Sequence, residues 1–155
     1  MTISPFLSTV AYLIHLTVSV TEEPFDIKAE KAEISFSDVD ENAWYAEYVY
    51  ALSEAGIING RDDGSFGIGD EITRQEIAVM LERVALYKGI EIGDDSADIN
   101  FEDNNDIADF AKSAIKKMCS AGIISGYPDG SVKPLESANR AVAAQLVYKV
   151  LLNVQ

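Results

Sequence analysis

The sequence predicts an all-α fold in which two similar helix–loop–helix units and an N-terminal helix surround one shared core. Three observations support this: an internal repeat, apolar residues at helical spacing, and glycines at the expected ends of helices. The repeat is found by shifting the chain by 66 residues, which lays Ala55-Gly56-Ile57-Ile58 over Ala121-Gly122-Ile123-Ile124. Repeats of this length are typical of supersecondary units that bury their apolar faces against one another.

Composition and charge exclude several classes of function. The 155 residues include 26 Asp and Glu but only 12 Lys and Arg, a formal net charge of -14. So acidic a chain is poorly suited to nucleic acid or to an anionic membrane, because both require basic residues. His15 is the only histidine and Cys119 the only cysteine, so Cys/His zinc sites and internal disulfides are excluded. His15 also sits in an apolar run, which is typical of a packed or surface helix residue rather than a catalytic one. We therefore expect that the chain is not an enzyme and binds no cofactor.

Residues 1–20 are expected to form a helix, and residues 21–35 an acidic connector. Ser4 and Pro5 are suited to the N-cap and the first helical position, and Phe6, Val10 and Leu13 then share one face. One interpretation is that this helix is the remnant of a first repeat whose first half is absent. The alternative is a signal peptide, but no Lys or Arg precedes Lys28 to form its positive region.

Residues 36–90 form the first complete repeat. Its first helix is predicted from Trp44, Tyr48 and Leu52, and Gly56 supplies the left-handed residue that ends a helix. A turn over 59–64 follows, rich in Gly, Asp and Asn. Thr73-Arg74-Gln75-Glu76 is a capping box that begins the second helix, whose apolar stripe is Ile77, Met80, Leu81 and Val84.

An acidic linker over 91–100 leads to the second repeat, residues 101–155. Ile107, Phe110, Ala114 and Met118 predict its first helix, and Ser125-Gly126-Tyr127-Pro128-Asp129-Gly130 is a strong tight-turn signal. Asn139 replaces Thr73 as the cap of the second helix. Val142 replaces Glu76, so the reciprocal half of the capping box is lost.

These motifs resemble the S-layer homology (SLH) domain over residues 36–152, most of the chain. The first repeat carries Phe36-Ser37-Asp38-Val39, Trp44 and Ile72-Thr73-Arg74-Gln75-Glu76, and the second carries Gly126-Tyr127-Pro128-Asp129-Gly130 intact. The resemblance implies tandem repeats about a pseudo-threefold axis, here with an incomplete first repeat. It also implies an exported protein held at the bacterial cell wall or S-layer by binding a secondary cell-wall polysaccharide, often pyruvylated.

The resemblance also implies a glycan-binding site. The family's binding arginine corresponds to Arg74 and Arg140, and its early aromatic residue to Trp44 and Phe110. The family's loop residues correspond to Gly60, Asp63, Gly64, Gly126, Asp129 and Gly130. A pyruvate ketal presents a carboxylate, which matches the planar fork of an arginine and the N–H groups expected to be unpaired at a helix N-terminus.

Each of these residues also has a purely structural interpretation. Arg74 and Arg140 could form surface ion pairs, Trp44 could be a core residue, and the glycines and aspartates of the loops could serve the turns alone. Asp38 and Asp103 are expected to cap or brace the start of each first helix.

Two rival functions remain open. One is calcium binding, but an EF-hand count from Asn59 puts cationic Arg61 at a ligand position, and the same count from Ser125 puts Tyr127 there. A looser calcium site among Asp94, Asp95, Asp98, Asp103 and Asp106 is the other form of that idea. The second rival is protein association, with a preceding or partner SLH repeat packing where the first repeat is incomplete.

Overall fold

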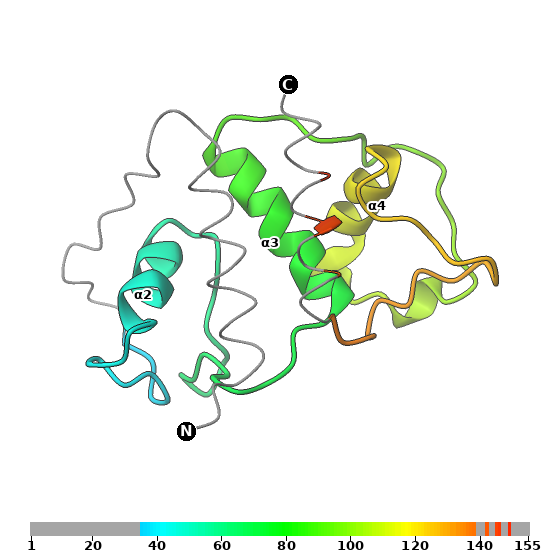
Figure 1. Cartoon of the computed structure of the whole chain (residues 1–155). Coiled ribbons are helices and arrows are strands. Elements are labelled where there is room, and N and C mark those ends of the chain that lie inside the picture. The colour runs from blue at the N-terminus through cyan, green and yellow to red at the C-terminus, as the bar shows by residue number, and fades with distance from the viewer. Residues whose placement is uncertain (1–34, 139–141, 143–144, 147–148, 150–155) are drawn as a thin grey trace. The chain divides into compact units, whose positions relative to one another are not determined.

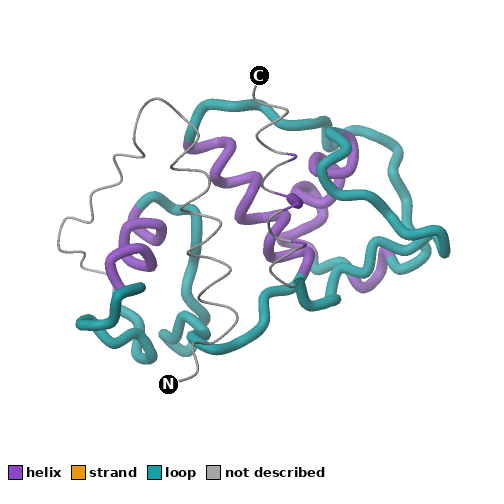
Figure 2. The backbone as a smooth tube through the Cα atoms, viewed as in Figure 1, coloured by secondary structure: helices purple, strands orange, loops and turns teal. Residues whose placement is uncertain are grey.

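The computed structural model describes residues 35–138 together with 142, 145, 146 and 149. The described residues form helices and loops with no strand (Figures 1 and 2), which confirms the all-α class. The helices are α2 (Ala46–Glu54), α3 (Arg74–Tyr87) and α4 (Lys112–Ser120), with short 3-10 turns η1 (Asn104–Asp106) and η2 (Asp109–Ala111). The predicted N-terminal helix, the 21–34 part of the connector, and Arg140 lie outside the described residues.

The chain divides into two compact units, Met1–Glu71 and Ile72–Gln155, here called the N-terminal and C-terminal units. The boundary falls inside the first repeat, just before α3. The second helix of the first repeat therefore packs with the second repeat, and α3 lies against α4 (Figure 1). Repeat boundaries in the sequence and unit boundaries in space are thus different. The predicted pseudo-threefold arrangement stays a prediction.

The N-terminal unit has a small core beneath α2. Val49 and Leu52 of this helix are buried, as are Ile57 and Ile58 just after it. Gly56 has a φ of 70° and reverses the chain there, as predicted from its position. The Phe36 ring stacks on Tyr50 with centroids 6.2 Å apart, so the start of the repeat closes over the helix.

Asp38 ties the start of the first repeat to the segment after its glycine turn. Its carboxylate accepts backbone N–H bonds from Phe66, Gly67 and Ile68 at 2.7, 2.8 and 2.7 Å. Burial tends to raise the pKa of Asp38, but the backbone donors outweigh burial and lower it. Of the two roles expected for Asp38, capping of the first helix is wrong, because its partners lie 28–30 residues further along the chain; the carboxylate instead braces the segment that precedes α2.

Asp103 plays the same part in the C-terminal unit. It accepts the N–H groups of Val132 and Lys133 at 2.9 and 2.7 Å, so it also does not cap the helix that follows it. The core of this unit lies between α3 and α4, and its fully buried members include Ile77, Ile115, Met118, Ile123, Ile124 and Val132. An ion pair between Lys117 and Glu82, 2.7 Å long, joins the two helices at their edge.

The capping box predicted for α3 is present. The Thr73 backbone N–H donates to the Glu76 carboxylate at 2.7 Å, and the Glu76 N–H donates to the Thr73 hydroxyl at 3.4 Å. The side chains of Thr73 and Glu76 thus satisfy each other's backbone N–H groups, which fixes where the helix begins and where Arg74 stands.

Candidate functional site

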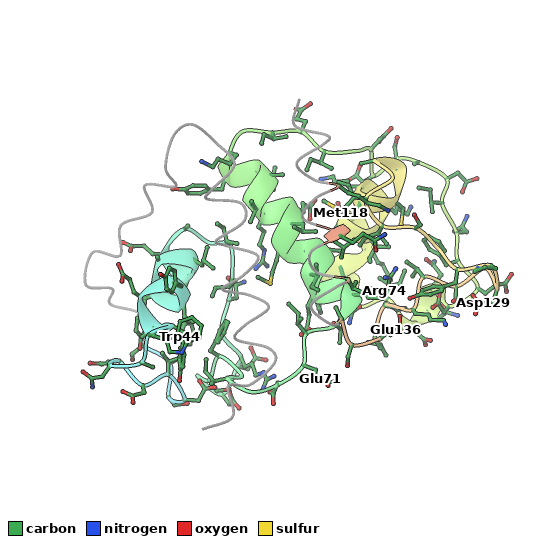
Figure 3. The ribbon with its side chains drawn as sticks, in the orientation of Figure 1. Trp44, Glu71, Arg74, Met118, Asp129 and Glu136 are labelled. Carbon is green, nitrogen blue, oxygen red and sulfur yellow. The ribbon has the colours of Figure 1, made fainter. Side chains whose placement is uncertain are left out.

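Arg74 is held in the glycine loop of the second repeat. Its Nε donates to the carbonyl oxygen of Val132 at 3.0 Å, and its Nη2 donates to the carbonyl oxygen of Ser125 at 3.2 Å. These two acceptors stand at either end of the Gly126–Gly130 turn, so the guanidinium bridges the base of the loop. Arg74 is only 7% exposed. Figure 3 shows it at the N-terminal end of α3, within the C-terminal unit that also holds Asp129 and Glu136.

The backbone donors of the first turn of α3 are already occupied. The Arg74 N–H donates to the Glu136 carbonyl and the Gln75 N–H to the Pro134 carbonyl, both at 3.0 Å. With the Glu76 N–H held by Thr73, the unpaired donors expected from the sequence are not available. That expectation is wrong, because a stretch far along the chain supplies the missing acceptors. The partial positive charge of the helix end remains.

The Tyr127 ring lies in the second loop, next to the side chains of Arg74 and Lys133. The Arg74 guanidinium carbon is 5.2 Å from the Tyr127 ring centroid, and the Lys133 ammonium is 4.1 Å from it. The Tyr127 hydroxyl donates to the Glu136 carboxylate at 2.5 Å, and this bond, with burial, raises the pKa of Tyr127. Ring, cations and carboxylate together make a polar, aromatic surface on the loop.

Tyr127, Lys133 and Glu136 were missed by the sequence analysis as site residues. Tyr127 lies inside the Gly-Tyr-Pro-Asp-Gly turn, so its place in that motif was an available signal. No local pattern marks Lys133, which has a φ of 50°, a conformation rare for a residue other than glycine.

The turn residues of both loops serve the turns as the structural interpretation expects. Asp63 accepts from the backbone and hydroxyl of Ser65, and Asp129 does the same with Ser131. Gly64 and Gly130 both have a φ of 81°. Close packing explains the other two glycines, since an added Cβ would lie 2.3 Å from the Phe36 ring at Gly60 and 2.9 Å from the Phe101 ring at Gly126.

In the second loop, Tyr127 and Glu136 lie next to Arg74. The first loop has different residues at the two equivalent positions. Arg61 stands where the second loop has Tyr127, and Asp70 stands where it has Glu136. Arg61 pairs with Asp70 at 2.5 Å, and both side chains are about half exposed. The Arg61 guanidinium also lies over Gly67, where a Cβ would approach it to 2.7 Å. The first loop therefore carries its own cation, whereas the second receives Arg74 from α3.

The predicted site residues are thus divided. Arg74 is brought together with Gly126, Asp129 and Gly130, as part of the C-terminal unit. Gly60, Asp63, Gly64 and Trp44 belong to the N-terminal unit, which is described by itself. Arg140 is outside the described residues.

Trp44 and Phe110 are surface residues. Trp44 is 53% exposed and Phe110 62%, so the core interpretation of Trp44 is wrong. The reason is that α2 begins at Ala46, which leaves Trp44 in the preceding turn rather than on the buried helix face. Its ring rests edge-on against Tyr45, with centroids 5.7 Å apart.

The described carboxylates form no group of three or more that is arranged to hold a metal ion. In the 94–106 stretch, Asp94 accepts from Ser96 and Asp98 from Asn100. Asp95 accepts from the Ser113 hydroxyl, and Asp103 from the backbone of Val132 and Lys133. Among the described helices, none has the length and apolar character needed to cross a membrane.

Comparison with known proteins identifies the family. The model of the S-layer homology domain matches residues 35–78 and 100–144, more than half of the chain. The chain belongs to this family, and each matched segment begins one residue before a repeat predicted from the sequence. It is a cell-surface anchoring module, of the kind found in proteins of the bacterial cell wall and S-layer.

Three relatives show the range of proteins that carry this module. The chain is 36% identical over 130 residues to exoglucanase XynX of Acetivibrio thermocellus, covering 81% of the chain but 12% of that protein. It is 27% identical to the cellulosome-anchoring protein of the same organism, covering 79% of the chain and 27% of the relative. It is also 27% identical to S-layer protein EA1 of Bacillus anthracis, over 71% of the chain and 13% of the relative.

The chain spans between 5% and 27% of the length of the curated relatives it matches. The likeness to exoglucanase XynX is therefore a likeness to a small part of that protein, and the matched part is the anchoring module.

Proposed function

We propose that the chain anchors a protein to the bacterial surface by binding an acidic or pyruvylated secondary cell-wall polysaccharide at the second loop. The observation that carries this proposal is the insertion of Arg74 between the carbonyl groups of Ser125 and Val132, beside Tyr127 and Lys133. No bond is made or broken in this function, because the site has only to hold its ligand.

The charge of Arg74 supports an anionic ligand. Its two bonded nitrogens face neutral carbonyl groups, and no carboxylate of the described residues forms a salt bridge with it. A buried cation without a paired anion is costly, so an incoming carboxylate gains more there than at an exposed arginine. Nη1 donates to no described residue and is the nitrogen left for such a ligand.

The surface of the loop supports a sugar. Tyr127 presents part of a ring that a pyranose face can stack on, and Lys133 places a second cation over the same ring. Arg74, which is buried, would then orient the ligand, and the more exposed Lys133 would add a second contact.

Binding is best tested with Lys133 rather than with Arg74→Ala alone. Removing Arg74 takes a donor away from the carbonyl groups of Val132 and Ser125, so loss of binding could reflect a damaged loop. Lys133 is half-buried at the surface, and its ammonium lies over the Tyr127 ring, 4.1 Å from the centroid. Wild type, Lys133→Ala and Arg74→Lys should be compared in sedimentation with purified cell-wall sacculi.

We expect Lys133→Ala to weaken binding about tenfold or more, as the loss of one charge-assisted contact of about 1.5–3 kcal/mol implies. Arg74→Lys keeps the charge but loses the planar fork, and should also weaken binding. Lys88→Ala, which removes the same charge at the end of α3, is the control and should bind as wild type does. Unchanged binding by Lys133→Ala and Arg74→Lys would show that the site is wrong.

A further inference from the structure

The C-terminal unit contains a pocket that the anchoring site does not use. It has a volume of about 340 Å³ and lies between the 95–104 stretch and the helix α4. This volume is at the lower end of the range for small-molecule sites, about 300–1,000 Å³. All its lining residues belong to one unit, so its shape does not depend on how the two units are placed.

The pocket is lined by the most basic helix of the described chain. α4 carries Lys112, Lys116 and Lys117 and no acidic residue, whereas α2, its counterpart in the first repeat, carries two glutamates and no base. Lys112 and Lys116, one helical turn apart, both line the pocket. In a chain with a net charge of -14, this concentration of positive charge is exceptional.

The two lysines differ in how they are occupied. Lys112 pairs with Asp109 at 2.5 Å, but the Asp109 side chain is 96% exposed, so a ligand can readily displace that contact. Lys116 is half-buried and forms no hydrogen bond or ion pair with the described part of the chain. Lys116 is therefore a cation that lines the pocket and has no paired carboxylate among the described residues.

Comparison of the two repeats shows what shape the pocket accepts. In the first repeat the Tyr50 ring stacks on Phe36, parallel to within 1°. The equivalent residues of the second repeat are Lys116 and Phe101, and both line the pocket. A lysine thus replaces the aromatic ring, and Phe101 lines the pocket with no stacked ring partner among the described residues.

The rest of the lining suits the hydroxyl groups of a sugar. Asp95 accepts from the Ser113 hydroxyl at 3.2 Å, and Asn100 and Asn104 add amide donors and acceptors. Ile99, Ile107 and Ile115 supply the apolar part of the wall. Among the lining residues, one carboxylate, Asp95, stands against two lysines.

We infer that this pocket binds a carboxylate-bearing sugar, with its ring against Phe101 and its carboxylate on Lys116 and Lys112. The site is separate from Arg74 and needs no contribution from it. The two are close in the fold, because the Phe101 ring that lines the pocket also packs against Gly126 of the second loop. A polysaccharide of acidic sugars could therefore be contacted at two places by one unit.

The test is a titration of the isotopically labelled chain with a defined probe, methyl β-D-glucuronoside, followed by nuclear magnetic resonance. The neutral methyl β-D-glucoside and inorganic phosphate are the comparison probes. Because the probe is a free sugar, the result is independent of the sacculus assay at Arg74 and Lys133.

We expect saturable shifts of the backbone amides of residues 99–104 and 112–116 with the glucuronoside. Lys116→Ala should weaken the binding about tenfold, equivalent to ~1.4 kcal/mol, and Lys116→Arg should restore most of it. Lys88→Ala should leave it unchanged. The spectrum of each variant shows directly that it is folded.

Three outcomes would overturn the inference. Equal affinity for the neutral glucoside would remove the role of the carboxylate. Equal affinity for phosphate would reduce the pocket to a simple counter-ion site. Binding by Lys116→Ala as tight as wild type would show that the pocket is not where the sugar lies.

Discussion

Arg74 donates from Nε to the carbonyl oxygen of Val132, 58 residues further along the chain and 3.0 Å away. This single bond joins the second helix of the first repeat to the glycine loop of the second. With the bond from Nη2 to Ser125, it makes the arginine that opens α3 part of the loop of the next repeat rather than of its own.

Arg74→Ala should destabilise the C-terminal unit. Two backbone carbonyl groups lose a charged donor, and we expect the free energy of unfolding to fall by about 2–4 kcal/mol. Chemical denaturation followed by circular dichroism measures this change. Lys88→Ala removes a positive charge from the other end of α3 and should cost less than about 0.5 kcal/mol. An Arg74→Ala variant as stable as Lys88→Ala would mean that the bridge contributes nothing.

Asp38→Asn should lower the free energy of unfolding at neutral pH and make it depend less on pH below pH 4. The folded-state pKa of Asp38 is lowered from the ordinary 3.8, so its contribution is present above that pH and is lost as the pH falls through the lower folded value. We expect a loss of about 1–3 kcal/mol at pH 7, and a smaller further loss than wild type shows below pH 4.

The matched control for Asp38 is Asp62→Asn, an exposed aspartate of the same unit. This variant should leave unchanged both the free energy of unfolding at pH 7 and its fall below pH 4. The role given to Asp38 is wrong if Asp38→Asn follows the wild-type curve from pH 7 to pH 3.

The Arg61–Asp70 pair should contribute little to stability. Both side chains are about half exposed, and exposed pairs couple by about 0.2–1 kcal/mol. A double-mutant cycle of Arg61→Ala and Asp70→Ala measures this coupling, which should shrink further in about 1 M salt. A coupling above about 2 kcal/mol, insensitive to salt, would show that the pair is a structural element of the first loop.

Moderate salt should preserve or improve binding to the wall polymer. Residues 36–71 carry nine acids and one base, and residues 91–109 carry eight acids and no base, so the chain as a whole repels an anionic ligand. Salt screens this repulsion beyond a Debye length of about 8 Å at physiological ionic strength, while the contact at Arg74 is short and less screened. A steep loss of sacculus binding with the first additions of salt would indicate a different mode of attachment.

The features that the sequence predicts well are those that depend on neighbours in the chain. The capping box of Thr73 and Glu76 and the left-handed glycines at 56 and 122 follow from contacts within a few residues. The all-α class follows from the same local signals, repeated twice. The turns of both loops are likewise closed by an aspartate and a serine two positions apart.

The features that the sequence does not predict depend on residues far apart. The acceptors of Arg74 lie 51 and 58 residues away, and those of Asp38 lie 28–30 residues away. Trp44 fits the helical spacing of a core residue, but the helix starts two residues later and the ring is exposed. Helical periodicity specifies a face only for residues that are in the helix.

Sedimentation of the chain with purified sacculi, before and after chemical removal of their secondary polysaccharide, tests the anchoring proposal most directly. The proposal predicts saturable binding to the intact sacculi, loss of binding to the stripped ones, and competition by the released polymer. Equal binding to intact and stripped sacculi, or no binding to either by a folded chain, would contradict it.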